Sequence, residues 1–130
     1  MTNPNLDTVQ SAYAAFGRGD IPAVLATLAP EVESQARGLP ARGTHIGPWQ
    51  VAQNVFSAVP QDWAEFALIS EDFFADGDTV IVRGRVQAVA RATGRSMDAP
   101  FGHVFTVADG KIQHLTNHHD TALWVQALGT

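Results

Sequence analysis

The sequence predicts a single α+β domain in which helices pack on a strongly curved antiparallel sheet and leave an apolar pocket between them. In the first half of the 130-residue chain, apolar residues recur at helical spacing, and in the second half they alternate as they do along strands. The strands follow one another without intervening helices, which favours a meander over a parallel sheet. A chain of this length buries its own core, so we predict one domain spanning residues 1–130.

The composition restricts the classes of function. Apolar residues make up 45% of the chain, and no run is long enough to span a membrane. Cysteine is absent, which excludes disulfides and thiolate nucleophiles. The net charge of −5 argues against nucleic-acid binding. The sequence contains no Gly-rich loop of the phosphate-binding type, so we expect no nucleotide and no other cofactor. The N-terminal residues do not resemble a signal peptide, which predicts a cytoplasmic protein.

Three helices are expected before residue 61. The first carries an apolar stripe at helical spacing, formed by Leu6, Val9, Tyr13 and Phe16. The second begins after Asp20, which can cap it, and ends at Pro30. The third runs from Pro48 to Pro60. Between the second and third helices we expect a short strand over 31–36 and a loop over 38–48.

The rest of the chain is predicted as four strands and a final helix. Turn residues separate the strands, at 76–78, at 92–95 and at Asp109-Gly110. Asp120 can cap the last helix, which carries Leu123 and Leu128. The expected strands cover residues 66–75, 79–90, 101–107 and 111–119.

Some of these strands are apolar on both faces. Phe73 and Phe74 are adjacent, and the strand over 101–107 has apolar residues at both odd and even positions. A sheet that is apolar on both sides must bury both sides. The helices can cover one face, and a homodimer through the sheet is the simplest cover for the other. The alternative is that one chain folds over itself.

Four of the five histidines lie on the predicted final hairpin. If Ala108 pairs with Lys111, His103 faces Thr116, while Asn117 faces Gly102 on the other side of the sheet. His114 and His118 then lie about 13 Å apart at roughly 3.3 Å per residue, so we expect no metal site. Each histidine is a candidate acid or base, and the alternative is a structural histidine bonded to backbone.

Other polar and aromatic residues have two interpretations each. Asp120 either orients a histidine or caps the last helix, and its position favours the cap. Arg85 and Gln87 form part of a polar stripe that is either solvated or directed into a cavity. Tyr13 and Trp49 are expected in the core or around the pocket. Ser34 lies where a strand leaves for a loop, at the pocket mouth or in solvent.

Five stretches together resemble the SnoaL-like group of the nuclear-transport-factor-two-like superfamily. That superfamily includes ketosteroid isomerases, limonene epoxide hydrolases and polyketide cyclases, and the resemblance covers nearly the whole chain. It implies a cone-shaped α+β barrel, usually dimeric, around a deep apolar cavity. The stretches are Phe16-Gly17-Arg18-Gly19-Asp20, Val24-Leu25-Ala26-Thr27-Leu28, Ala99-Pro100-Phe101-Gly102-His103-Val104-Phe105, Asp109-Gly110-Lys111-Ile112 and His118-His119-Asp120-Thr121-Ala122.

The resemblance also implies that the usual catalytic acids are absent. The isomerases have their Asp base where this chain has Ser34, a second Asp at Gly102, and a tyrosine one step from Tyr13. The epoxide hydrolase arginine matches Arg85, but the two flanking acids fall on Gln87 and Asn117. The Asp of the polyketide cyclases has His119 and Asp120 as its nearest titratable counterparts.

These comparisons assign one face of the final hairpin to the cavity. They direct Gly102, Val104, Leu115, Asn117 and His119 inward together with Arg85 and Gln87, and His103 outward. A β-bulge would exchange the two faces. Two functions are therefore expected. One is an acid–base enzyme for a small apolar carbonyl or cyclic substrate, with His119 as the acid or base, Asn117 and Gln87 orienting, and Arg85 stabilising an oxyanion. The other is a non-catalytic ligand-binding or interaction domain with a degenerate site.

Overall fold

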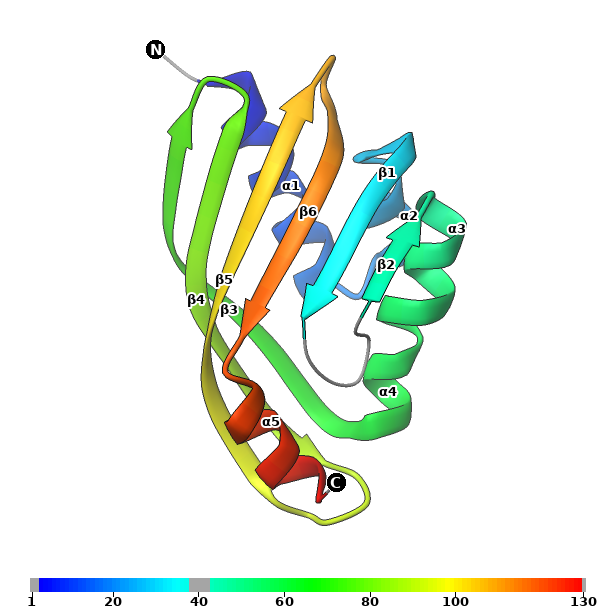
Figure 1. Ribbon diagram of the computed structural model, residues 1–130, viewed down its shortest axis with the longest axis vertical. Coiled ribbons are helices and arrows are strands. Elements are labelled where there is room, and N and C mark those ends of the chain that lie inside the picture. Colours follow the sequence, from blue (N-terminus) through cyan, green and yellow to red (C-terminus); the bar gives the residue numbers. More distant parts are fainter. Residues whose placement is uncertain (1–2, 38–42, 130) are drawn as a thin grey trace.

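The computed structural model describes residues 3–37 and 43–129, and its centre is one open six-stranded sheet (Figure 1). The strand order is β2-β1-β6-β5-β4-β3, and every neighbouring pair is antiparallel except β1 and β6, which are parallel. The sheet ends at β2 and β3, so it does not close into the expected barrel. The elements are α1 (Pro4–Gly17), α2 (Ile21–Leu25), β1 (Leu28–Arg37), β2 (Gly43–Ile46), α3 (Pro48–Val51), the π-helical turn η1 (Ala52–Phe56), α4 (Ala58–Asp62), β3 (Trp63–Asp76), β4 (Thr79–Ala90), β5 (Ser96–Ala108), β6 (Lys111–His119) and α5 (Thr121–Leu128).

The helices follow the predicted stripes, with corrections at their ends. Asp20 caps α2 by accepting a hydrogen bond from the Ala23 amide at 3.1 Å, as predicted. Helix α2 ends at Leu25 instead of Pro30, because β1 has already begun at Leu28. Pro60 does not end the third helical segment. It lies in the first turn of α4, where a missing N–H costs no intrahelical bond.

The segment predicted as a loop over 38–48 holds more structure than expected. Residues 38–42 lie outside the described residues, and the next four form β2, which pairs with β1. The predicted turn at Asp109-Gly110 is confirmed: both residues have positive φ, 54° and 72°, as a tight two-residue hairpin requires. Asp120 caps α5 by accepting from the Leu123 amide at 3.3 Å, which confirms the structural interpretation of this residue.

One β-bulge changes the register of the final hairpin. Ala108 pairs with Lys111 as expected, but Gln113 is an extra residue on β6, and beyond it Thr106 pairs with His114. The Gln113 side chain donates a hydrogen bond to the Ala108 carbonyl at 3.0 Å, which ties the bulge to the turn. His103 therefore lies opposite Asn117, and the expectation that it faces away from the cavity is wrong.

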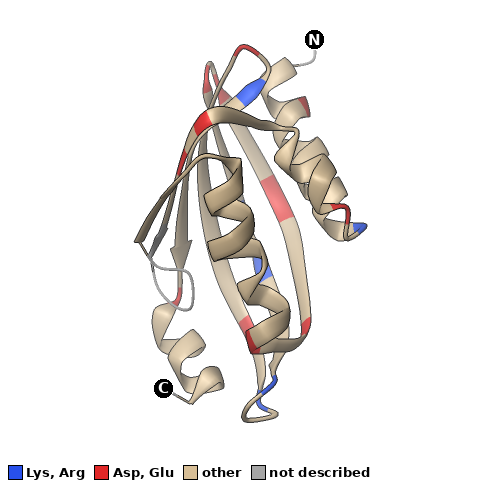
Figure 2. Cartoon of the chain, turned by 90° about the vertical axis from the view of Figure 1, so that its right-hand side faces the viewer, with Lys and Arg blue, Asp and Glu red and all other residues tan. Residues whose placement is uncertain are grey.

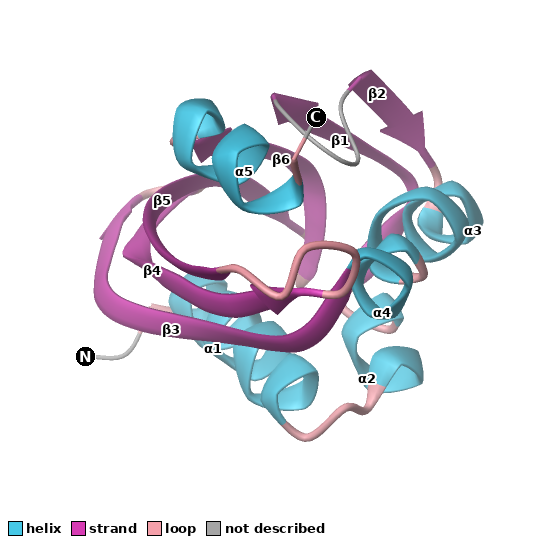
Figure 3. Cartoon of the chain, turned by 90° about the horizontal axis from the view of Figure 1, so that it is seen from below, coloured by secondary structure: helices cyan, strands magenta, loops and turns pink. Residues whose placement is uncertain are grey.

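The sheet bends strongly and wraps one side of an interior (Figure 3). Helix α1 packs across β3 to β6, the α3–α4 segment packs beside β1 and β2, and α5 packs against β4 and β5 at one end. The helical segment over 48–61 has no charged residue, and it faces the viewer in Figure 2. Within the described ranges, no helix combines the length and apolar character needed to cross a bilayer.

Candidate functional site

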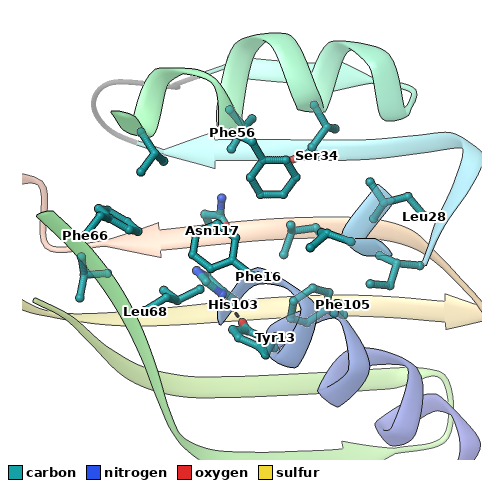
Figure 4. Close-up of a pocket in the computed structure, with 18 of the residues that line it drawn as sticks. Tyr13, Phe16, Leu28, Ser34, Phe56, Phe66, Leu68, His103, Phe105 and Asn117 are labelled. Carbon is teal, nitrogen blue, oxygen red and sulfur yellow. Dashed lines mark hydrogen bonds between the residues drawn. The ribbon is translucent and has the colours of Figure 1, made fainter. Parts of the chain in front are cut away.

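A cavity of about 150 Å³ lies between the sheet and the helices (Figure 4). It is surrounded by 22 described residues, and none of them is Asp, Glu, Lys or Arg. The π-helical turn η1 places Val55 and Phe56 over it, and such turns are rare and frequently occur at functional sites. The lining residues are Ala12, Tyr13, Phe16, Val24, Leu28, Val32, Ser34, Val51, Val55, Phe56, Val59, Trp63, Phe66, Leu68, Val86, His103, Phe105, Ile112, Leu115, Asn117, His119 and Trp124.

The polar lining residues come from three neighbouring strands and one helix. Ser34 on β1, His103 on β5 and Asn117 on β6 are 1%, 8% and 8% exposed, and they are the buried polar residues of the described chain. His103 and Asn117 are cross-strand partners, and Ser34 pairs with the residue two positions before Asn117. Cross-strand partners have Cβ atoms about 5 Å apart, so these side chains converge on one wall.

Tyr13 reaches this wall from α1. Its hydroxyl hydrogen-bonds His103 Nδ1, the contact drawn as a dashed line in Figure 4. Burial raises the pKa of Tyr13, so the hydroxyl keeps its proton. Burial, helped by the nearby His119 and His118, lowers the pKa of His103 to about 3, so its imidazole is neutral at neutral pH. The pair is therefore uncharged.

His119 lies on the same wall. Its ring centroid is 6.5 Å from that of His103 and 4.7 Å from that of Trp124 on α5. Burial, with a smaller effect of His118, lowers the pKa of His119 to about 4. At neutral pH it is a neutral imidazole that can accept a proton, and its Nδ1 atom is buried with no hydrogen-bond partner.

Unpartnered polar atoms concentrate around the cavity. Within the described part of the chain, six buried side-chain nitrogen or oxygen atoms lack a hydrogen-bond partner, and five belong to lining residues. A buried polar group without a partner costs about 1–3 kcal/mol, so such atoms usually bind water or a ligand. The five are Ser34 Oγ, Trp63 Nε1, Asn117 Oδ1, His119 Nδ1 and Trp124 Nε1.

The structure brings together half of the residues predicted for the site. The lining residues among them are Tyr13, Ser34, His103, Leu115, Asn117 and His119. Gly102 and Val104 alternate with His103 along β5 and do not line the cavity. The bulge at Gln113 puts Asn117 on the same face of the sheet as His103, so Gly102 and Val104 lie on the opposite face. Trp49 is 72% exposed and lies outside the core and the cavity, contrary to expectation.

Arg85 and Gln87 lie on the outer face of β4. Arg85 Nε donates to Asp98 at 2.6 Å, and the Gln87 amide donates to the other oxygen of the same carboxylate at 3.4 Å. Of the two interpretations of this polar stripe, the solvent-facing one is correct, and neither side chain lines the cavity. Within the described ranges, no three His, Asp or Glu residues are placed to hold a metal ion.

Sequence reasoning missed most of the aromatic lining. The sequence places Phe16 only in an apolar helical stripe, and it assigns no role in the site to Phe56, Trp63 or Trp124. Phe16, Phe66, Trp63 and Trp124 form a chain of ring contacts that begins at Phe56, with centroids between 5.4 and 6.3 Å apart. The spacing of Phe16 in its helical stripe was the one available signal.

Comparisons with known proteins agree with this architecture. A family model described as a SnoaL-like domain matches residues 9–115. None of the curated proteins compared with the chain matches it.

Solved structures extend the likeness to the whole chain. An NTF2-like protein from Burkholderia thailandensis is 34% identical, with 98% of each chain covered and a TM-score of 0.93. An NTF2-like protein from Burkholderia pseudomallei is 31% identical over 99% of this chain and 100% of that one, with a TM-score of 0.92. A protein from Xanthomonas campestris, provisionally named a polyketide cyclase, is 26% identical over 96% of each chain, with a TM-score of 0.81.

Proposed function

Because the chain belongs to the SnoaL-like family, whose fold hosts more than one reaction, we propose its function from the cavity: acid–base catalysis on a small, uncharged carbonyl or cyclic compound. The observation that carries the proposal is the pair of neutral imidazoles, His103 and His119, on one polar wall of a mostly apolar cavity. No charged side chain among the described lining residues could pair with a charged ligand. Burying an unpaired charge is very costly, so the ligand is neutral.

The roles of the two histidines follow from their partners. We assign the donor role to the Tyr13 hydroxyl, which keeps its proton, and the acceptor role to His103 Nδ1, which places the ring proton of His103 on Nε2. His103 is then a fixed donor for a carbonyl oxygen. His119 Nδ1 has no hydrogen-bond partner, and we assign this nitrogen as the base. Asn117, directly across from His103, orients the substrate.

The chemical step is a proton transfer beside a carbonyl group. His119 takes a proton from the carbon next to the carbonyl, the C–H electron pair forms the C=C bond of an enolate, and the carbonyl π pair moves to oxygen. The enolate oxygen accepts the hydrogen bond from His103, and the imidazolium of His119 delivers a proton back to carbon, which is a deuteron when the imidazolium N–H has first exchanged with D₂O. The oxyanion role expected for Arg85 passes to the Tyr13–His103 pair, because Arg85 is bound to Asp98 outside the cavity.

Deuterium exchange tests this step before the natural substrate is known. With 2-tetralone in D₂O, we expect the protein to accelerate deuterium uptake at the carbon beside the carbonyl, followed by NMR. His119→Gln should lower the rate by about 100-fold or more, within the range that one acid or base contributes. Tyr13→Phe should lower it by about 10-fold or more, because His103 loses its hydrogen-bond partner. His118→Gln is the matched control, because His118 is exposed and not among the lining residues.

The alternative function is a binding domain without catalysis. It is favoured by one observation: no carboxylate is found among the described residues around the cavity. If 2-tetralone binds but exchanges no faster than with free imidazole, the enzyme proposal is wrong and the binding domain stands. Exchange that is unchanged in His119→Gln would also contradict the assignment of the base.

We further propose a homodimer through the outer face of the sheet. Phe74, Ile81 and Val104 pair in one row across β3, β4 and β5, and the first two are 55% and 42% exposed. The next row holds the Asp72–Arg83 ion pair, so an apolar row lies beside both signs of charge, and such a patch can be complementary to its own copy across a two-fold axis. Sedimentation velocity should give a dimer at micromolar concentration and a monomer for Ile81→Glu. A monomeric wild type, or a dimeric variant, would contradict this interface.

A further inference from the structure

The two buried indoles, Trp63 and Trp124, form a second polar feature of the cavity, separate from the Tyr13–His103 pair. They are 2% and 4% exposed, and their ring centroids lie 5.4 Å apart at an interplanar angle of 87°. Both line the cavity, and the Nε1 atom of each is buried without a hydrogen-bond partner. An indole N–H can only donate, so each requires an acceptor.

Within the indole pair itself, an aromatic face can serve at most one of the two donors. In an edge-to-face pair, the edge of one ring meets the face of the other, and an N–H on that edge gains a weak N–H···π contact. An edge-to-face pair offers at most one such contact, so the second N–H gains no acceptor from its partner ring, and neither Nε1 atom has a conventional hydrogen-bond partner. An oxygen atom inside the cavity would supply what is missing.

Helix α5 holds Trp124 in place from outside the cavity. The Thr93 hydroxyl donates to the Ala127 carbonyl at 2.6 Å, and Arg95 donates to the Gln126 carbonyl at 2.7 Å. These bonds fasten the last turn of α5 to the turn between β4 and β5, beside Trp124. The helix lies after residue 115, where the family model ends.

We propose that Trp63 and Trp124 form a hydrogen-bond donor subsite that binds a neutral acceptor oxygen of the ligand, such as a carbonyl or ether. This inference rests on the proposal that the cavity binds a small uncharged molecule. It adds a specificity: a ligand with an oxygen at this end is favoured over a hydrocarbon of the same shape, because only the oxygen pairs the buried donors. Trp63 and Trp124 are specificity-determining residues and take no part in proton transfer.

Two probes of nearly identical shape test the subsite. Acetophenone and α-methylstyrene differ in one position, where the first has a carbonyl oxygen and the second a CH₂ group. In the protein with ¹⁵N-labelled tryptophan, each of the three indole N–H groups gives one NMR signal. Acetophenone should move the proton signal of Trp63 or Trp124 downfield, and α-methylstyrene should not. Trp49, which is 72% exposed, is the internal control and should not move with either probe.

Affinities from the same titrations give the second measurement. Trp124→Phe keeps an aromatic ring and removes the N–H, so acetophenone should bind about 3- to 10-fold more weakly relative to α-methylstyrene. Trp63→Phe tests the other donor. If one variant does not fold, benzothienylalanine at the same position replaces only the N–H by sulfur. The proposal is overturned if neither buried indole signal responds to acetophenone and neither variant changes the affinity ratio.

The binding test and the exchange test fail independently. A protein that selects acetophenone but exchanges no deuterium has the subsite without the catalysis. If the protein accelerates deuterium uptake but acetophenone moves neither the Trp63 nor the Trp124 indole signal, the catalysis is present and the subsite is absent.

Discussion

Gly84→Ala should unfold the protein or destabilise it by more than about 4 kcal/mol, although it adds a single methyl group. A Cβ atom at this position of β4 would lie 2.0 Å from the Ile69 carbonyl oxygen and 2.8 Å from two ring carbons of Phe101. The first contact is with backbone, which cannot rotate away. Relief would therefore require β3 and β4 to separate, and the free energy of unfolding would fall accordingly.

The close approach of β3 and Phe101 to Gly84 coincides with a bend in the sheet. Gly84 pairs with Ser70 beside a bulge in β3, where the register shifts before Asp72. Bulges and strand glycines bend a sheet, and this bend brings the far parts of β3 and β4 around the cavity. The Phe101 ring, on the neighbouring strand β5, occupies the space that a side chain at position 84 would take. It stacks on the His103 ring, with the two ring centroids 4.2 Å apart.

Gly102→Ala is the matched control for this prediction. Gly102 lies on the adjacent strand β5, and a Cβ atom there would meet no atom within 4 Å. Its free energy of unfolding in urea should stay within about 1 kcal/mol of wild type. Equal stabilities of the two variants would contradict the steric role of Gly84.

Local patterns predicted the elements well and the site only in part. The stripe in α1, the alternation in β4 and the left-handed turn at Asp109-Gly110 are properties of short segments, and each was correct. The capping role of Asp120 was also readable, because a cap depends on the next three residues.

The position of His103 could not be predicted in the same way. It depends on the bulge at Gln113, and β6 must pair with β5 on one side and with β1 on the other. Nothing in the residues around Gln113 signals this double requirement, and one extra residue exchanges the faces of the whole strand beyond it. The Trp63–Trp124 pair could not be predicted either, because it depends on contacts between distant parts of the chain. Helix α5, which carries Trp124, is held by hydrogen bonds to residues about 30 positions earlier.

Acidification should destabilise the protein steeply between pH 6 and pH 4, before most carboxylates are protonated. The cause is the burial that lowers the pKa of His103 to about 3 and that of His119 to about 4. In the unfolded chain both groups return to the ordinary value of about 6.5. Below pH 6.5 the unfolded state therefore binds protons that the folded state does not, and the free energy of unfolding falls as the pH falls.

The expected size follows from the width of this window. Each histidine contributes up to about 1.4 kcal/mol per pH unit, so the two together remove roughly 5 kcal/mol between pH 6 and pH 4. That loss is comparable to the whole stability of a small domain, about 5–15 kcal/mol. Urea unfolding at a series of pH values measures it directly, because the midpoint should shift while the m-value stays constant.

Replacing one histidine separates this effect from the protonation of carboxylates. His119→Gln should remove about half of the pH dependence between pH 6 and pH 4, since the neutral amide binds no proton in either state. The exposed ion pairs Arg83–Asp72 and Arg85–Asp98 are unchanged in this variant, so their contribution cancels in the comparison. His118→Gln, at an exposed position of the same strand, should keep most of the slope. If His119→Gln loses stability as steeply as wild type, then the pKa of His119 in the folded state is close to its unfolded value, and burial does not hold this side chain neutral between pH 6 and pH 4.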